Sequence, residues 1–167
     1  TRRAVRNLLF RHAGFLFKDL ASWQAWETER RFEAEYNTPP ETLRKTRNAI
    51  FSQWLSHETA SPAFLFITHG LGGGTEVHVQ AMAAALEKEN IRVLVLRSGR
   101  GERVHIGHPK EEAGQRLIFD FSREYDTFLD MLSRLNIRHL HVHHTIDFPP
   151  AFLRRVQEIA AALDVEY

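Results

Sequence analysis

Apolar and polar positions follow two different patterns along this chain, and the change falls near residue 60. Over residues 4–35 the large apolar side chains recur at roughly helical spacing, and a break at 36–40 precedes a second helical pattern over 40–56. We expect a helical arm or hairpin over residues 1–60. Its many aromatic side chains favour packing against the following domain, with docking of a partner or a membrane surface, or self-association, as alternatives.

From Ala63 onwards short apolar runs alternate with helical patterns. The runs predict strands at 63–69, 91–97 and 137–143, with shorter ones around 104–106 and 117–119, and the helical patterns lie at 75–89, 122–135 and 150–163. This alternation predicts an α/β fold over residues 61–167, a Rossmann-like parallel sheet with helices on both faces.

Ligands of such sheets bind where the strand order reverses, at the carboxyl ends of the strands. Two unusual segments reach that edge: the glycine loop after the first strand and the tip of the histidine-rich strand at 137–143. In the usual strand order these two strands are neighbours. We therefore expect the two segments to face one cleft.

Composition narrows the classes of function. The chain has 22 Lys and Arg against 21 Asp and Glu, so its formal charge of +1 gives no general attraction to nucleic acid. It has no cysteine, which excludes a disulfide framework and a thiolate metal site and fits a reducing cytoplasm. No apolar run approaches the ~20 residues that span a bilayer. We expect a soluble, cytoplasmic protein without a nucleic-acid partner.

Both ends look internal to a longer protein. The chain opens on Thr1, and its last residues, Leu163-Asp164-Val165-Glu166-Tyr167, repeat the helix-to-strand pattern seen at 89–93 and 135–139. We expect a strand to begin at Val165 and the chain to be a domain fragment truncated at its C-terminus.

The loop Gly70-Leu71-Gly72-Gly73-Gly74-Thr75 is built for close approach of a ligand to the backbone. The helix that follows directs its free N–H groups and positive dipole end at the same place, which favours an anion such as phosphate. The loop lacks the third glycine of the dinucleotide fingerprint and the Gly-Lys pair of a P-loop. The alternative is that the glycines only make a tight turn.

The residues after the glycines have structural as well as functional explanations. Thr75 stands where a helix N-cap is expected, and Glu76 lies in the first turn, where the dipole favours a negative side chain. Because Glu76 would compete with a bound phosphate, we expect it to point toward a sugar hydroxyl or an amide. His78, one turn in, faces either the cleft or solvent. At the end of the second strand Arg97 could suit the 2′-phosphate of NADP.

The histidine strand carries the other candidate chemistry. Alternation places His139, His141 and His143 on one face and His144 on the other. A His-x-His pair can bind a metal, but only Asp147 offers a nearby carboxylate, so we expect no metal. At the strand tip His143 and His144 could instead hydrogen-bond sugar or phosphate oxygens, or act as general acid or base. His139, at the start of the strand, is expected to be structural.

These motifs resemble a known family. The run Gly72-Gly73-Gly74-Thr75-Glu76-Val77-His78-Val79, followed by 83–86 and 91–95, resembles the opening βαβ unit of retaining, GT-B-type glycosyltransferases of family 4. Residues 137–143 resemble that family's strand ending in His-x-His. The resemblance covers roughly residues 63–167.

The resemblance implies two Rossmann-like domains, the N-terminal one mostly holding acceptor and the C-terminal one holding a nucleotide-sugar, with no metal or other cofactor. It implies that Gly72, Gly73 and Gly74 lie near the donor phosphates or the acceptor, and that the catalytic residue His143 lies near the transferred sugar. The remaining candidate substrate-binding residues are Thr75, Glu76, His78 and His144. The family's paired-glutamate donor motif is absent from this chain.

The expected function is therefore the acceptor-side domain of an enzyme that moves a sugar from a nucleotide-sugar to a polysaccharide or glycolipid. The fragment is not expected to turn over substrate without its second domain. Two alternatives stay open: an NADP-binding domain of an oxidoreductase, and a non-catalytic interaction module whose aromatic arm docks a partner.

Overall fold

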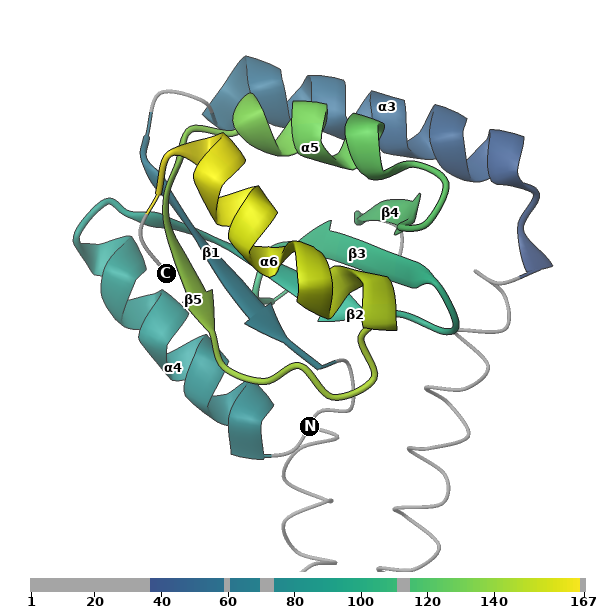
Figure 1. Cartoon of the computed structure of the whole chain (residues 1–167). Helices are drawn as coiled ribbons and strands as arrows, with labels where there is room; N and C mark the ends of the chain where they lie inside the picture. The colour runs from purple at the N-terminus through teal and green to yellow at the C-terminus, as the bar shows by residue number, and fades with distance from the viewer. Residues whose placement is uncertain (1–36, 59–60, 70–73, 111–114, 166–167) are drawn as a thin grey trace, which may run out of the picture. The chain divides into compact units, whose positions relative to one another are not determined.

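The computed structural model describes residues 37–58, 61–69, 74–110 and 115–165 (Figure 1). The described helices are α3 (Pro40–Glu58), α4 (Gly74–Lys88), α5 (Tyr125–Ser133) and α6 (Pro150–Leu163). The described strands are β1 (Ala63–Thr68), β2 (Arg92–Ser98), β3 (Arg103–Gly107), β4 (Leu117–Asp120) and β5 (Ile137–Val142). The helix expected over 4–35 lies outside the described residues.

The described strands form one five-stranded sheet in the order β4-β3-β2-β1-β5. Strand β1 pairs in parallel with β2 and with β5, whereas β3 is antiparallel to both β2 and β4. The predicted α/β class is confirmed and is consistent with a Rossmann-like fold. The prediction of a wholly parallel sheet is wrong, because the sheet is mixed.

The hairpin between β2 and β3 explains the mixed sheet. A parallel pair needs a crossover of about a dozen residues or more, and only the short loop from Gly99 to Glu102 separates these strands. The Gly99 N–H donates to the Arg103 carbonyl at 2.8 Å, and Gly101 adopts a φ of 66°, which a residue without Cβ reaches without strain. The chain therefore turns back on itself beside β2.

After each of α4, α5 and α6 the chain passes through a polar residue whose backbone has the left-handed conformation. Asn90 has a φ of 59°, and Asn136 and Asp164 each have a φ of 53°. Asn and Asp are the non-glycine residues that tolerate this conformation best. After Asp164 the Val165 N–H returns to the Ala160 carbonyl at 3.1 Å, which closes the last turn of α6. The first two of these joints lead into β2 and β5, as their sequences predict.

Helices cover both faces of the sheet, as predicted. Helices α3, α5 and α6 share the larger core, to which β1 contributes Leu65 and Ile67. Helix α4 covers the other face, where it packs through Val79 and Ala83 against the smaller core that contains Phe66. Figure 1 shows α6 crossing in front of the sheet and α4 at the lower left, apart from the other three helices. The alternating side chains of β1 thus serve two separate cores.

Helix α3 belongs with the sheet, although the sequence pattern groups it with the arm. Residues 39–167 form one compact unit, and α3 contributes Phe51 and Trp54 to the larger core with 3% and 5% of their surfaces exposed. The Trp54 ring lies 5.0 Å from the His108 ring, centroid to centroid. These two aromatic side chains pack against the domain, which is the expectation favoured over docking of a partner.

An ion pair between a buried arginine and a partly exposed glutamate holds α3 in place. Arg47, with 2% exposed, donates two hydrogen bonds to the Glu124 carboxylate at 2.9 and 2.8 Å and one to the Ile118 carbonyl at 2.9 Å. Its guanidinium also lies 4.5 Å from the centre of the Phe119 ring. Burial opposes ionisation of Glu124, but the hydrogen bonds and charge of Arg47 outweigh it and hold the pKa of that carboxyl below its usual value.

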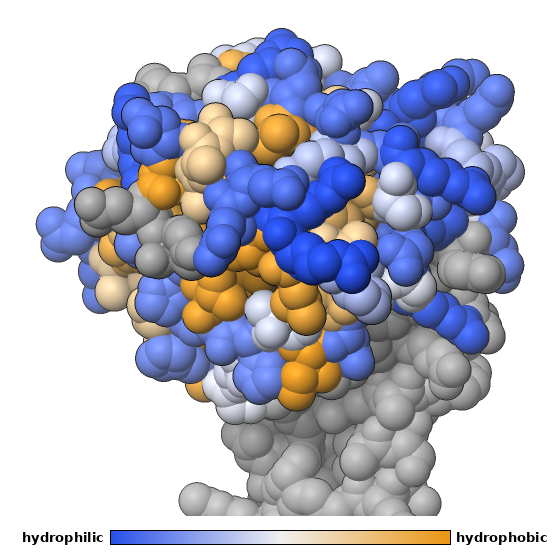
Figure 2. All heavy atoms as spheres, viewed as in Figure 1, coloured by the Kyte–Doolittle hydropathy of each residue, from blue (hydrophilic) through white to orange (hydrophobic). Residues whose placement is uncertain are grey.

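The α6 side of the unit carries separate apolar groups on its surface. The exposed large apolar side chains of the described residues are Val77, Val142, Ile146 and Leu153. Figure 2 shows that apolar surface on this side is divided by hydrophilic side chains. Among the described helices, none combines the length and apolar character needed to cross a membrane.

Removing the carboxylate that pairs with buried Arg47 should cost far more stability than removing an arginine from an exposed ion pair. We expect Glu124→Ala to lower the free energy of unfolding by about 3 kcal/mol, because Arg47 keeps its buried charge and loses its partner. Urea unfolding followed by circular dichroism measures the change. Arg123→Ala is the control, since its side chain is 81% exposed and its 3.8 Å contact with Asp120 should contribute at most ~0.5 kcal/mol. Equal losses in the two variants would contradict the role of the pair.

Candidate functional site

The candidate site lies at the carboxyl edge of the sheet, where β1 ends at Thr68 and β5 at Val142. These strands are neighbours, as the expected strand order requires. Beyond the strands, the backbone N–H groups of His143 and His144 both donate to the Ile67 carbonyl, at 2.8 and 3.3 Å. The histidine tip is therefore held directly beside the point where the chain enters the glycine loop.

The start of α4 supplies the second part of this edge. The helix begins at Gly74, so Thr75 lies in its first turn rather than at the N-cap position predicted for it. A Cβ added to Gly74 would meet no atom within 4 Å, so packing among the described residues does not require a glycine here. The two preceding glycines, Gly72 and Gly73, lie outside the described residues, and their predicted contact with a ligand stays a prediction.

Glu76 joins the first turn of α4 to the end of β2. Arg97 Nη2 donates to Glu76 Oε1 at 2.8 Å, and the Gln80 side-chain amide donates to the same oxygen at 3.2 Å. Only 12% of the Arg97 side chain and 22% of the Glu76 side chain are exposed. Glu76 thus faces a guanidinium and a protein amide, and the positive charge of Arg97 is balanced within the protein.

The histidines of β5 line the α4 face of the sheet, as alternation predicts. The ring centroids of His139 and Phe64 are 4.9 Å apart, and those of His141 and Phe66 are 5.5 Å apart. The His143 ring continues the row, 4.4 Å from His141. Three imidazoles therefore follow one another along a single face and end at the carboxyl edge.

The remaining histidines of the edge surround this row. His78 is exposed on α4, and its ring centroid lies 5.6 Å from that of His143. His144 turns away from the row toward His69, at 5.1 Å, and its Nδ1 accepts a hydrogen bond from the Ile146 N–H at 3.4 Å. Of the two predicted tip residues, the structure therefore brings His143, not His144, against the α4 side.

His143 closes the row at the carboxyl edge of the sheet. Its Nε2 atom is buried and has no hydrogen-bond partner among the described residues. Burial lowers the pKa of its imidazole below the usual value, and charge on His141 and His78 lowers it further. A neutral imidazole with an unpartnered nitrogen can hydrogen-bond a hydroxyl or exchange a proton with one.

Thr68 is a candidate that the sequence analysis did not single out. It is fully buried at the end of β1, and its Oγ1 has no hydrogen-bond partner among the described residues. Alternation along β1 places it on the same face as Phe66. The only signal in the sequence is a polar residue that ends an apolar run directly before the loop. Buried polar atoms are nearly always paired, so the unpartnered atoms of Thr68 and His143 make this edge a candidate place for a polar ligand.

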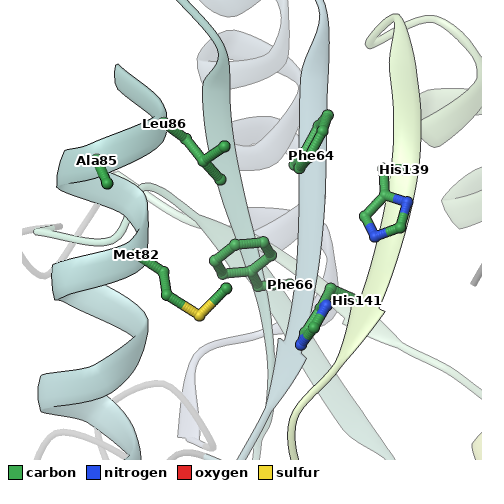
Figure 3. Close-up of a pocket in the computed structure, with 7 residues that line it drawn as sticks. All are labelled: Phe64, Phe66, Met82, Ala85, Leu86, His139 and His141. Carbon is green, nitrogen blue, oxygen red and sulfur yellow. The ribbon is translucent and has the colours of Figure 1, made fainter. Parts of the chain in front are cut away.

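An apolar trough continues from this edge along the same face. Its volume is about 370 Å³. It is lined by Phe64, Phe66, Met82, Ala85, Leu86, His139 and His141. Figure 3 shows the side chains of α4 on one side, the two phenylalanines of β1 between, and the two imidazoles of β5 on the other side. The sequence analysis missed it, because apolar residues at helical spacing normally indicate a filled core.

The histidines do not form a recognisable metal centre. Within the described residues, no group of three or more His, Asp or Glu side chains is placed to hold a metal ion. Asp147, the carboxylate considered with the strand, lies in an exposed position with a φ of 63°.

Comparison with known proteins gives no family assignment. No protein-family model matches the chain, and neither a curated protein nor a solved structure matches it.

Two histidines with lowered pKa values, the buried His105 and the partly buried His143, should make the fold sensitive to mild acid. Burial, followed by the charges of Arg116 and Arg97, holds the pKa of His105 well below its usual value, and that of His143 is lowered too. Both histidines take up protons on unfolding below about pH 6.5, so the free energy of unfolding should fall as the pH drops from 7.5 to 5.5.

Urea unfolding at several pH values measures this fall. His105→Gln keeps an acceptor for the Arg116 side chain, which lies 3.3 Å from His105 Nε2, and should reduce the pH dependence. His143→Gln should reduce it by a smaller amount, because His143 is only partly buried. An unchanged pH dependence in both variants would show that other groups cause the acid sensitivity.

Proposed function

We propose that the α/β unit is the acceptor-side domain of a retaining glycosyltransferase that moves a sugar from a nucleotide-sugar to a saccharide acceptor. The observation that carries the proposal is the place of His143. It lies at the junction of two adjacent parallel strands, faces the first turns of α4, and holds a buried Nε2 without a partner among the described residues.

The chemistry of this edge suits a sugar ring. A neutral imidazole can donate to or accept from a hydroxyl, and the Thr68 hydroxyl offers a second such group on the same face. The N-terminus of α4 favours negative charge, which supports a position for a donor phosphate near the glycine loop. His143 would thus hold the transferred sugar or its acceptor hydroxyl while the loop meets the phosphate.

The pairing of Glu76 with Arg97 favours this function over an NADP-binding domain. The NADP alternative depends on Arg97, the residue that would suit a 2′-phosphate. In the structure Arg97 Nη2 lies 2.8 Å from the Glu76 carboxylate. A phosphate bound there would have to displace or approach that carboxylate, which costs electrostatic energy. Burial of Phe51 and Trp54 in their own unit similarly counts against a docking role for this part of the expected arm.

Binding of simple saccharides to the full chain tests the proposal. Saturation-transfer NMR with methyl glucoside, methyl mannoside and methyl galactoside should detect weak contact with at least one of them. His143→Phe should weaken that contact about fivefold, because a hydrogen bond contributes ~1 kcal/mol. His108→Phe is the matched control, since His108 packs against Trp54 of the larger core.

Two results would contradict the proposal. One is saccharide contact that is the same in His143→Phe and in the wild-type chain. The other is tight binding of NADP with no response to saccharides or to UDP-glucose.

A further inference from the structure

We propose that the trough between α4 and β5 binds the unbranched apolar chain of a glycolipid acceptor. This inference rests on the proposed function and narrows it, since it selects a lipid-linked saccharide over a free polysaccharide.

The lining residues of the trough follow one another along three elements. Helix α4 contributes Met82, Ala85 and Leu86, which follow one another at intervals of three and four and form one stripe. In the parallel pairing of β1 and β5, Phe64 is opposite His139 and Phe66 is opposite His141. The walls therefore run parallel to the strands, which is the shape that an extended chain fills.

The lining favours an apolar occupant. None of the lining residues is Asp, Glu, Lys or Arg, so a phosphate or carboxylate would find no charged partner there. Met82 is unbranched and can adapt to the bends of a chain. A volume of about 370 Å³ lies at the lower end of the ~300–1,000 Å³ found for small-molecule sites. Ala85 is exposed, so the trough is reached from solvent at its α4 side.

The trough lies beside His143, the residue proposed to hold the sugar. Two of its lining residues also contact His143: the Phe66 ring lies 5.0 Å from the His143 ring, and the His141 ring lies 4.4 Å from it. An apolar chain in the trough would therefore place an attached sugar beside His143 Nε2.

The two methionines of the chain allow a direct test by NMR. Met82 lines the trough, whereas Met131 is 7% exposed in the larger core on the opposite face of the sheet. Methyl, butyl, hexyl and octyl glucoside, each kept below its micelle concentration, are added to the full chain labelled at the methionine methyl groups. The Met82 signal is assigned with Met82→Leu.

We expect the Met82 methyl signal to move on titration and the Met131 signal to stay. Affinity should rise about two- to fourfold for each added methylene, the increment expected for burial of a CH₂ group. Ala85→Phe places a ring in the opening and should weaken octyl glucoside binding at least ~10-fold. Ala81→Phe is the matched control, because Ala81 is exposed one turn earlier on α4 and does not line the trough.

The outcomes separate this inference from the proposed function. If methyl glucoside perturbs the His143 ring signal while no alkyl chain moves Met82, the saccharide site stands and the apolar-chain site is overturned. If hexanol and hexyl glucoside move Met82 equally and no glucoside affects His143, the trough binds apolar chains without an acceptor role, which overturns the glycolipid assignment. Equal binding to the Ala85→Phe and Ala81→Phe variants also overturns it.

Discussion

The structure depends on the central position of β1. This strand pairs in parallel on both edges, with β2 and with β5, and it is covered on both faces. Leu65 and Ile67 enter one core and Phe66 the other, all with at most 1% exposed. Because β1 is central, the strands beside it end at the same edge of the sheet as it does. There the Ile67 carbonyl accepts a hydrogen bond from the His143 N–H, which fixes the histidine tip beside the end of β1.

The two faces of the sheet are unequally covered, and the candidate site follows from that difference. Three described helices share the larger core, whereas α4 covers the other face alone and packs on the side of β2 and β1. On this face β5 presents imidazoles that are only partly buried. The trough is the space between α4 and these imidazoles. An apolar floor beside polar rings gives one ligand both hydrophobic contact and a hydrogen-bonding partner.

Two ion pairs attach helices to the sheet, and they differ in their consequence. Arg47 and Glu124 join α3 to the residues between β4 and α5, and serve stability. Glu76 and Arg97 join α4 to the end of β2, so the charge of Arg97 at that strand end is balanced within the protein.

Local patterns in the sequence determined the order of the helices and strands, the coverage of both faces and the orientation of His139, His141 and His143. Each of these depends on spacing of two or about 3.6 residues, which is a property of neighbouring residues. The antiparallel pairing of β3 with β2 also has a local cause, because the loop at 99–102 is too short for the crossover that a parallel pair requires.

Only the tertiary structure decided the partners of residues far apart in the chain. The Glu76–Arg97 pair, the place of α3 beside β4 and the trough between α4 and β5 all depend on which strands and helices become neighbours. Periodicity shows that Met82 and Leu86 share an apolar face, but it does not show whether that face is filled. Whether the face is filled depends on the volume left between packed helices and strands, and this volume cannot be worked out from any single segment of the sequence.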